Sequence, residues 1–536
     1  MLRTALAAVS TRLTGGSASG DLDRQRFAWL VAGLFALVTV PRLLTHELWR
    51  DEAWLWLVAT ESRTLADLAS SLARSGQGSL FPLLCYFASG FSVAPRVLQG
   101  LHLVLAVAGV FAFVRWAPLR RAHRVLFVLG YLPFYEYAVI SRHYAAGALL
   151  LWLACAAMGR RRPAIALGAA LGLLCQTTVY GFILAVAVGA GWLVDRRIRR
   201  QAPADPAPPP SASSAAPIPL RTAAVGLALA AAGGIAGILQ LVPDAGTSFA
   251  QGWRFGWHPM VAARVLQAPW RAFVPLPLPG LHFWNSNLFD GWPNFQTIAG
   301  LLALAGAIAF VWPRKAALVT FLIGAAGFSA FGYVKFIGSI RHDGHWWLLF
   351  LAAIWMGGGL TASATQNGRA ALRRSWRSPL LLVLLILHCA SGAYASWIDL
   401  RQPFSNAART ALAVRGLGLD RLPLLGYREP PAAPVALALG QALFSPSRGR
   451  FVTHPDWGPE QHDLTLPVLR CAARALAAAE GRDIGLVVNR ELPQWEEIEA
   501  QDAVLGAIEA SEDYHLYRLY LDRLTRSALA AGCPAD

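Results

Sequence analysis

The sequence predicts an α-helical polytopic membrane protein with about 11 transmembrane helices and a small C-terminal α/β domain outside the cytoplasm. Of its 536 residues, 55% are hydrophobic and only 15% are charged, and apolar runs of bilayer-crossing length recur along the chain. The arginines gather in short segments between these runs, and a polar tail follows the last run. Repeated apolar runs with basic connections are typical of a protein that crosses the bilayer many times.

The net charge of +16 bears on orientation rather than on nucleic-acid binding. The arginines flank apolar runs, as do the charges that set the topology of a membrane protein. We therefore expect no nucleic-acid partner. The first segment, 1–26, has no short apolar core with a small-residue cleavage site, and we expect it to stay on the protein in the cytoplasm.

Hydropathy along the chain predicts the individual spans, each of about 20 residues or fewer where neighbouring helices shield it. The expected spans are 27–44, 97–117, 125–141, 143–158, 164–178, 179–194, 221–243, 296–312, 316–337, 345–365 and 379–397.

An N-terminus inside the cell puts every arginine-rich connection on the cytoplasmic side, as the positive-inside rule demands. This arrangement requires 80–91 to be an interfacial or re-entrant helix rather than a span. It also requires 164–194 to form two short spans that turn near Thr177 and Thr178. The cytoplasmic connections are then 118–124, 159–163, 195–220, 313–315 and 367–378.

The chain divides into five parts on this basis. The tail mixes a short apolar run at 484–488 with helical periodicity at 469–479, which predicts a small α/β domain. An odd number of spans puts this domain outside, on the same side as the first outer loop. The parts are the cytoplasmic segment 1–26, an N-terminal membrane module 27–200 with outer loop 46–96, a Pro/Ala-rich cytoplasmic linker 201–220, a C-terminal membrane half 221–398 with outer loop 243–295, and the periplasmic domain 399–536.

The six cysteines fall into two groups. Four lie in apolar runs and are expected to pack as small hydrophobic side chains: Cys85, Cys155, Cys175 and Cys389. Cys471 and Cys533 lie in the polar tail and could form a disulfide in an oxidising compartment, although their spacing alone does not decide it.

Three groups of polar residues meet the outer border of the bilayer in this topology. An acidic pair follows the first span, a basic and aromatic turn separates two later spans, and a histidine-rich segment precedes the tenth. Charged side chains that converge from separate helices at a bilayer border indicate a functional site. The candidates are Asp51 and Glu52; Arg142, His143 and Tyr144; and Arg341, His342, Asp343 and His345.

Each group also has a simpler explanation. The acidic pair suits a helix N-terminus, where the helix dipole favours carboxylates. Arg142 can snorkel to phospholipid headgroups. The segment 341–345 could cap a helix or bind a divalent metal, but its spacing is not typical of a metal site, and we expect no cofactor. The outer-loop tryptophans, Trp257 among them, suit an aromatic belt, and one or two of them could stack on a sugar.

At these residues the chain resembles the GT-C superfamily of integral-membrane glycosyltransferases, which includes protein O-mannosyltransferases and lipid A aminoarabinose transferases. The stretch Trp49-Arg50-Asp51-Glu52-Ala53-Trp54 resembles the family's first-loop Asp-Glu motif, and Ser141-Arg142-His143-Tyr144 resembles its Arg-x-Tyr turn. The outward polar tail resembles its periplasmic domain. The likeness covers most of about the first 200 residues by layout and the rest more loosely, and the order and sidedness of the motifs make it specific.

The resemblance implies a glycosyltransferase of the bacterial inner membrane and cell envelope. The enzyme would move a hexosyl or pentosyl group from a polyprenyl-phosphate donor to a lipid, glycan or protein acceptor at the periplasmic face. Asp51 would be the general base opposite the leaving group, and Glu52 would orient Asp51 or the acceptor. Direct displacement would invert the anomeric centre.

The same resemblance implies a binding site for the donor phosphate. Arg142 and Arg341 would stabilise its charge as charge-assisted hydrogen-bond donors, with His342 and His345 beside it. The candidates for contact with the rest of the substrate are Tyr144, Trp54 and Trp257.

One segment departs from the family pattern. Many relatives carry a Gly-His-Pro type segment later in the first loop, and the corresponding stretch here reads Gly76-Gln77-Gly78-Ser79-Leu80-Phe81-Pro82. Ser79 lies near the place of the expected histidine. The resemblance therefore implies no second catalytic or phosphate-binding residue there, and it leaves open altered or lost activity.

Two other classes of function compete with this one. A transporter or flippase of a lipid-linked or amphipathic substrate would carry polar residues at mid-span and internal pseudo-symmetry. Polar mid-span residues are few, Gln176 and Gln240 among them, and the sequence shows no convincing repeat. A scaffold whose outer domain binds a partner would not require charge to gather at three loops. The transferase is the reading that the motifs favour.

Overall fold

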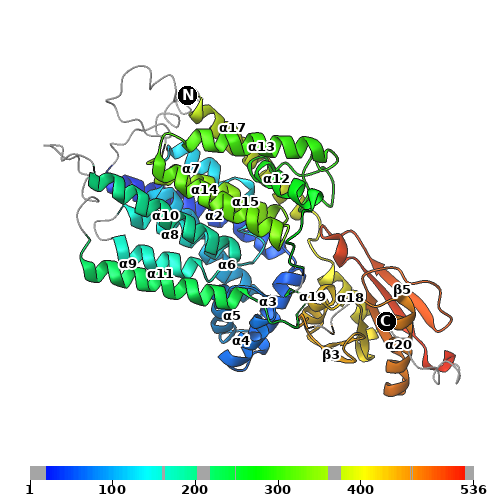
Figure 1. Ribbon diagram of the computed structural model, residues 1–536. Helices are drawn as coiled ribbons and strands as arrows, with labels where there is room; N and C mark the ends of the chain where they lie inside the picture. The colour runs from blue at the N-terminus through cyan, green and yellow to red at the C-terminus, as the bar shows by residue number, and fades with distance from the viewer. Residues whose placement is uncertain are drawn as a thin grey trace.

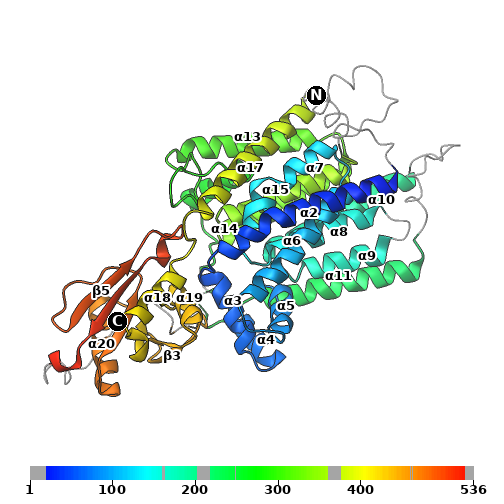
Figure 2. The same cartoon turned by 180° about the vertical axis from the view of Figure 1, so that it is seen from behind.

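The computed structural model describes residues 20–524 except 160–162, 202–217, 248, 251, 360–375, 459, 461 and 462. Long helices form a bundle, and a smaller domain of helices and strands lies at one end of it (Figure 1, Figure 2). This is the fold class expected from the sequence. Most of the expected N-terminal segment and of the Pro/Ala-rich linker lies outside the described residues.

The bundle contains seven helices that are long and apolar enough to cross a membrane, counted over the described part of the chain. They are α2 (Asp21–Thr45), α6 (Arg96–Trp116), α10 (Val179–Gln201), α11 (Leu220–Leu241), α13 (Pro293–Val311), α14 (Lys315–Val334) and α17 (Arg377–Asp399). The shorter helices α8 (Tyr144–Met158), α9 (Pro163–Leu174) and α15 (Ile340–Met356) lie among them. Each overlaps an expected span, although α2 begins six residues before 27, α10 ends seven residues after 194 and α15 ends nine residues before 365.

The expected span 125–141 is not a continuous helix, so that prediction was wrong. The segment forms α7 (Arg121–Val128), then a single π-helical turn, η1 (Leu132–Glu136), then non-helical chain up to α8. Pro133 lacks a backbone N–H and cannot continue an α-helical hydrogen-bond pattern. Nearly every residue from 131 to 146 is buried or half-buried. Irregular backbone at membrane depth is tolerated where protein surrounds it.

The first outer loop folds into three short helices, α3 (Arg50–Glu61), α4 (Leu65–Ala73) and α5 (Leu80–Ser89). The ten residues of α5 are too few to cross a bilayer, as expected for 80–91. The second outer loop contains α12 (Pro259–Phe273), a helix that the sequence did not predict, which packs against α13 and α15. Apolar residues mix with Arg264, Gln267 and Arg271 along α12, which weakens its hydropathy signal.

The run 164–194 turns between α9 and α10 at residues 175–178, as the sequence predicted. Gly78 of the first outer loop packs directly on this turn. A Cβ atom at Gly78 would lie 2.2 Å from the carbonyl oxygen of Gln176 and 2.6 Å from that of Thr177. The backbone N–H of Leu80 donates to the same Gln176 carbonyl at 3.2 Å. Glycine is therefore required for this close approach.

The C-terminal domain contains a six-stranded sheet in the order β3-β2-β1-β4-β6-β5. Strand β1 pairs in parallel with β2 and β4, and the outer pairings are antiparallel. All five residues of β4 are buried, as befits a central strand covered on both faces. The strands are β1 (Leu424–Gly426), β2 (Leu443–Ser445), β3 (Arg450–Val452), β4 (Ile484–Val488), β5 (Ile498–Val504) and β6 (Tyr514–Leu519).

The helices of this domain are α18 (Ala407–Gly416), α19 (Glu429–Leu439) and α20 (Leu466–Glu480), with short 3-10 turns at η3 (Leu419–Arg421), η4 (Ala510–Glu512) and η5 (Leu521–Arg523). The expected strand 484–488 and helix 469–479 are thus confirmed. Cys471 is disulfide-bonded. Cys533, the partner considered for it, lies outside the described residues.

The domain docks on the first outer loop. Helix α19 packs against α3, and the indole N–H of buried Trp54 donates to the carbonyl oxygen of Pro455 at 2.8 Å. The backbone N–H of Arg50 donates to Glu512 at 2.6 Å. Burial raises the pKa of Glu512 to about 8. These contacts place the C-terminal domain beside the start of α3.

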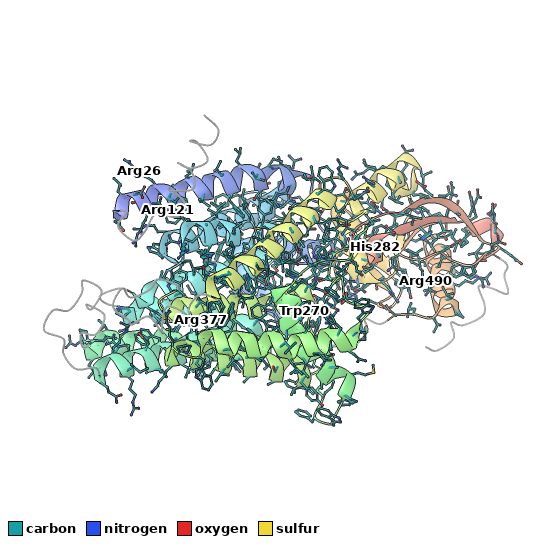
Figure 3. All side chains as sticks on the ribbon, turned by 90° about the horizontal axis from the view of Figure 1, so that it is seen from above. Arg26, Arg121, Trp270, His282, Arg377 and Arg490 are labelled. Carbon is teal, nitrogen blue, oxygen red and sulfur yellow. The ribbon has the colours of Figure 1, made fainter. Side chains whose placement is uncertain are left out.

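Described arginines of the expected cytoplasmic connections lie at the opposite end of the bundle. Figure 3 places Arg26, Arg121 and Arg377 towards that end and Arg490 in the C-terminal domain. The helix bounds agree with this, because α2, α14 and α17 begin there and run towards the domain. The separation of basic ends from the outer domain expected from the charge pattern is present in the structure.

Candidate active site

Three distant segments meet at Asp51. This residue lies in the first turn of α3, and its side chain is 20% exposed. Its Oδ2 atom lies 2.9 Å from Nη1 of Arg142 and 3.6 Å from Nη2 of Arg341. Arg50 approaches Oδ1 at 3.9 Å. Of the three polar groups expected at the bilayer border, the second therefore supplies Arg142 and the third supplies Arg341 to Asp51 of the first.

The charge of Asp51 follows from these neighbours. Partial burial favours the neutral carboxylic acid, but the guanidinium groups of Arg142 and Arg341 outweigh it and hold the pKa of Asp51 below its ordinary value. Asp51 is therefore a carboxylate at neutral pH. Nε of buried Arg142 makes no hydrogen bond to any described residue, so this arginine retains a donor for a further anion.

Two tryptophans hold Arg341. Its guanidinium carbon lies 4.9 Å from the ring centroid of Trp49 and 5.2 Å from that of Trp284. The two indoles meet edge to face at 4.7 Å. The Trp284 N–H donates to Glu136 at 3.1 Å, which fixes the ring. Contact with aromatic rings is a mode of binding that arginine favours.

Glu52 faces away from Asp51 and is fully buried. One carboxylate oxygen accepts a hydrogen bond from the backbone N–H of Ser141, the residue before Arg142. The other accepts from the backbone N–H of Trp49 at 3.2 Å and lies 3.2 Å from Nε2 of His46. Glu52 thus joins the start of α3 to the turn that carries Arg142. It holds the site together rather than pointing into it.

His46 completes this buried cluster. It follows the last residue of α2, and its Nδ1 lies 3.3 Å from Asp399 at the end of α17. Burial disfavours the imidazolium, but the carboxylates of Asp399 and Glu52 outweigh burial and raise the pKa of His46 to about 10. A charged imidazolium between two carboxylates therefore ties together α2, α3 and α17.

The two candidate histidines contact the aromatic side chains and backbone around the site. Nε2 of His342 lies 3.1 Å from the hydroxyl of Tyr144, and its Nδ1 is 3.1 Å from the backbone N–H of Ser339. Nδ1 of His345 donates to the His342 carbonyl at 2.9 Å, and its ring stacks on Tyr180 at 4.7 Å. These contacts orient Tyr144 and cap α15. Among the described residues, no three His, Cys, Asp or Glu side chains gather as a metal site would require.

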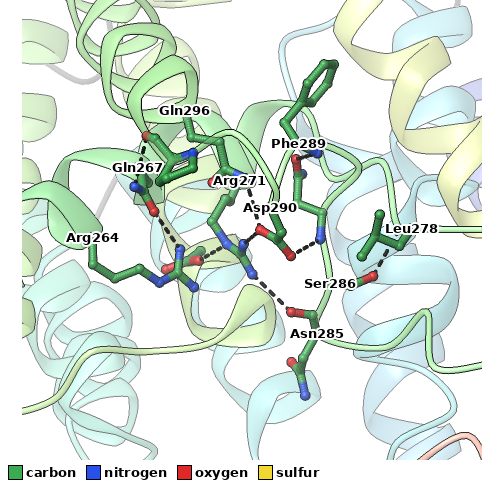
Figure 4. A network of polar contacts seen from close by, with 12 residues as sticks. Arg264, Gln267, Arg271, Leu278, Asn285, Ser286, Phe289, Asp290 and Gln296 are labelled. Carbon is green, nitrogen blue, oxygen red and sulfur yellow. Dashed lines mark hydrogen bonds and ion pairs between the residues drawn. The ribbon is translucent and has the colours of Figure 1, made fainter. Parts of the chain in front are cut away.

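A further network fixes the helix that carries Arg341 (Figure 4). Arg271, at the end of α12, is buried, and its Nε lies 3.2 Å from Asp343 in the first turn of α15. It also pairs with Asp290 and donates to the carbonyl oxygen of Asn285 at 3.0 Å. Asn285 follows Trp284 and has a left-handed backbone (φ 60°). Asp343 therefore joins α15 to the second outer loop.

Gln77 is a site residue that the sequence did not predict. Its Oε1 lies 3.5 Å from Nη2 of Arg142, on the segment that departs from the family pattern. The neighbouring Ser79 uses its backbone N–H to contact Gln240 at 3.2 Å. The amide of Gln77, rather than the hydroxyl of Ser79, thus reaches the arginine of the site. The sequence signal that could have identified Gln77 was its position in the segment that departs from the family pattern.

The two candidate tryptophans lie elsewhere. Trp54 is buried, contacts Trp457 at 6.1 Å between ring centroids, and belongs to the docking contact with the C-terminal domain. Trp257 is 78% exposed and stacks on Tyr333 at 6.3 Å, at the end of α14. The tryptophans shown in contact with an arginine of the site are Trp49 and Trp284, which both pack on Arg341.

No protein-family model and no curated protein matches this sequence. Among solved structures, the chain is similar to ArnT from Cupriavidus metallidurans bound to undecaprenyl phosphate, with 12% identity, a TM-score of 0.47, and coverage of 94% of this chain and 99% of that one. It is also similar to the apo state of the same ArnT, with 15% identity, a TM-score of 0.45, and coverage of 93% and 99%. ArnT is a lipid A aminoarabinose transferase, one of the groups that the motifs resemble.

Proposed function

We propose that this protein is a membrane glycosyltransferase that moves a sugar from a polyprenyl-phosphate donor to an acceptor at the outer face of the membrane. One observation carries the proposal. A partly exposed carboxylate, Asp51, lies between the guanidinium groups of Arg142, from the turn before α8, and Arg341, from the first turn of α15. The site lies at the end of the bundle that carries the C-terminal domain.

These residues provide what the reaction needs. An acceptor hydroxyl gives its proton to the Asp51 carboxylate while its oxygen attacks the anomeric carbon. The bond from that carbon to the phosphate oxygen breaks, and the electron pair leaves with the polyprenyl phosphate. Arg142 and Arg341 stabilise the charge that develops on the leaving phosphate. A single displacement of this kind inverts the anomeric centre.

The ion pairs suggest how donor binding prepares the base. Without a donor, Asp51 occupies the position between two guanidinium groups that a phosphate would also favour. A donor phosphate competes for Arg142 and Arg341, and its own charge lies near the carboxylate. Both effects raise the pKa of Asp51, which makes it a stronger base once the donor is bound.

Other residues position the two arginines. Glu52 holds the backbone before Arg142, and the indoles of Trp49 and Trp284 hold Arg341. The contact with His342 orients Tyr144. We assign no substrate contact to Trp54, because its indole N–H already binds the C-terminal domain.

The test is transfer of labelled sugar from polyprenyl-phosphate donors to membrane extracts by wild-type and Asp51→Asn protein. We expect Asp51→Asn to lose at least about 100-fold in rate, since a positioned general base contributes this much or more. Asp67→Asn is a matched control, because Asp67 lies in the same loop, is exposed, and only caps α4.

The outcomes separate the claims. Transfer by wild type and Asp67→Asn, with loss in a stably inserted Asp51→Asn, supports the proposal and identifies the acceptor from the labelled product. Equal transfer by all three proteins would show that Asp51 is not the base. If wild type transfers from none of the donors, the transferase proposal fails, and flipping of lipid-linked sugars becomes the reaction to measure.

A further inference from the structure

The start of α3, the helix that carries Asp51, lacks a side-chain cap from its own N-cap residue. That residue is Trp49, whose indole donates a hydrogen bond but accepts none. The backbone N–H groups of Glu52 and Ala53 donate to the carbonyl oxygen of Trp49, each at 2.9 Å. The N–H of Arg50, the first residue of the helix, has no acceptor within the helix. Its acceptor must come from another part of the chain.

Glu512 of the C-terminal domain is that acceptor. It ends the η4 turn between β5 and β6 and is fully buried. Its Oε1 accepts a hydrogen bond from the backbone N–H of Arg50 at 2.6 Å. Arg50 directly precedes Asp51 in the chain. The contact therefore fixes the backbone from which the Asp51 side chain extends.

The same turn also contacts the side chain of Arg50. Nη1 of Arg50 donates to the hydroxyl of Ser511 at 3.4 Å, and Nε of Arg50 lies 3.9 Å from Oδ1 of Asp51. The Ser511 hydroxyl in turn donates to Glu509 at 2.6 Å. Both the backbone and the side chain of Arg50 are thus held by the C-terminal domain, on the side where Arg50 approaches the carboxylate of Asp51.

The turn that carries Glu512 is itself fixed against the site. The backbone N–H of Glu509 donates to the carbonyl oxygen of Phe404 at 3.0 Å. The ring of Phe404 meets the indole of Trp284 edge to face at 4.9 Å and that of Trp49 at 6.4 Å. These are the two indoles that pack on one arginine of the site. The position of Glu512 is therefore coupled to that of the site residues.

Glu512 acts as an acceptor oxygen rather than as a charge. Burial disfavours its carboxylate and raises its pKa to about 8, although the hydroxyl of Ser405 and the N–H of Arg50 favour the charged form. At pH 7 the group is therefore mostly a neutral carboxylic acid, whose carbonyl oxygen still accepts a hydrogen bond. Glutamine offers the same oxygen at the same place, so it should replace Glu512 in this contact.

We infer that Glu512 is a positioning residue of the candidate active site, which holds the start of α3 so that Asp51 lies between Arg142 and Arg341. The C-terminal domain then takes part in the reaction by keeping the base in place. This inference rests on the proposed function, because it depends on the role of Asp51 as the base.

The experiment compares wild type with Glu512→Ala, which removes the acceptor, and Glu512→Gln, which keeps it. Glu61→Ala is the matched control. Glu61 is the last residue of α3, accepts from the hydroxyl of Thr453 at 2.7 Å and lies 3.3 Å from His454, so it joins the other end of the same helix to the same domain. All variants are full-length proteins purified in detergent.

The first readout is sugar transfer across pH. Glu512→Ala should lose about 10- to 100-fold in kcat, since a small misplacement of a catalytic group costs this much, with less change in KM for the donor. The acid limb of its kcat/KM should move to higher pH, because Asp51 then loses contact with the cations that lower its pKa. Glu512→Gln and Glu61→Ala should keep the wild-type limb.

The second readout does not require transfer. Hydrogen exchange of the backbone amides in 49–55, followed by mass spectrometry, should be roughly five-fold faster in Glu512→Ala, the effect of one lost hydrogen bond. Glu512→Gln should exchange as wild type does. If Glu512→Ala fails to fold, Glu512→Asp takes its place, because its carboxyl group is one carbon shorter and cannot reach the same position.

Three results would overturn the inference. They are unchanged exchange in Glu512→Ala, an unmoved acid limb despite faster exchange, and equal losses in Glu512→Gln and Glu512→Ala. A wild type that transfers from no donor would instead reject the proposed function. Exchange would then still test the hold of Glu512 on α3: faster exchange in Glu512→Ala alone would support it, and equal exchange in all variants would overturn it.

Discussion

At the scale of single residues, Asp51 and Glu52 are neighbours in the chain but have opposite environments. Successive helical residues point about 100° apart, so the two carboxylates face different surroundings at the start of α3. Asp51 is partly exposed beside two arginines, whereas Glu52 is buried among N–H donors and an imidazolium. The first suits chemistry with a substrate, and the second suits assembly of the site.

The ion pairs of Asp51 predict two different pH profiles. The rate constant kcat/KM reports the free enzyme, in which Arg142 and Arg341 depress the pKa of Asp51, so its acid limb should lie below the ordinary range for aspartate. The acid limb of kcat reports the donor complex and should lie at higher pH. Steady-state transfer rates between pH 3 and 8 measure both limbs.

Arg142→Gln is the informative variant for this prediction. Removing one guanidinium should move the kcat/KM limb to higher pH, because the carboxylate of Asp51 then loses a cation that stabilises it and its pKa rises. If the limb stays in place in Arg142→Gln, or if the two limbs of wild type coincide, the pairing of Asp51 with Arg142 does not control its protonation.

The buried imidazolium of His46 predicts a dependence of stability on pH. Its folded-state pKa of about 10 exceeds the value of about 6.5 in an unfolded chain. The stabilisation is therefore fully present below pH 6.5 and is lost as the pH rises through about 10. We expect the Tm of the detergent-purified protein to fall over this interval.

His46→Gln should lower the Tm at pH 6 and flatten its decline at higher pH, because breaking a buried ion pair costs about 3 to 5 kcal/mol. His258→Gln, a change at an exposed histidine of the second outer loop, should behave as wild type does. The same decline in His46→Gln as in wild type would assign the pH dependence to another group.

At the scale of elements, the broken segment between α7 and α8 has a structural purpose. Its π turn and non-helical chain carry Glu136, which binds Trp284, and Ser141, which binds Glu52. In a straight α-helix the backbone N–H of Ser141 would bond to the carbonyl oxygen of Tyr137, four residues earlier, and could not donate to Glu52. The irregular backbone therefore allows this one segment to bind both Trp284, which contacts Arg341, and Glu52, the chain neighbour of Asp51.

The contact between Gly78 and the turn at 175–178 gives a prediction at this scale. Gly78→Ala should displace the segment that carries Gln77 away from Arg142, because its Cβ would overlap the Gln176 and Thr177 carbonyls. We expect lower stability, by about 1 to 3 kcal/mol as overpacking usually costs, and lower transfer activity. Thermal unfolding and the transfer assay measure the two effects.

Gly100→Ala is the matched control for this variant. Gly100 lies in α6 with no atom within 4 Å of an added Cβ, and alanine favours a helix, so its stability should be unchanged or higher. Equal behaviour of the two variants would show that the close approach at Gly78 is not required.

At the scale of the whole molecule, the two ends of the bundle differ in chemistry. One end holds the candidate active site beneath a docked α/β domain, and the other collects arginines. From the positive-inside rule, we expect the arginine-rich end to lie in the cytoplasm and the domain in the periplasm.

This orientation predicts the result of reporter fusions. A fluorescent protein inserted in the linker 201–220 should fluoresce. Alkaline phosphatase fused after residue 524 should be active, because this orientation puts the C-terminal domain in the periplasm. The reciprocal fusions should both be inactive. Active phosphatase in the linker would reverse the orientation and put Asp51 on the cytoplasmic side.

The sequence by itself determined the membrane class, the approximate position of most spans and the segregation of the arginines. These properties follow from local hydropathy and charge, which any stretch of about 20 residues displays without its neighbours. The break between α9 and α10 and the small α/β tail were predictable for the same reason. The motifs also identified Asp51, Arg142 and Arg341 as candidates, although not that they touch.

Only the tertiary structure decided which side chains meet. The pairing of Asp51 with both arginines, the enclosure of Arg341 by Trp49 and Trp284, and the approach of Gln77 join segments far apart in the chain. It also gave Trp54 a docking contact instead of a substrate contact and broke the span expected at 125–141. Such contacts depend on how the helices pack side by side, and no local window of sequence contains that information.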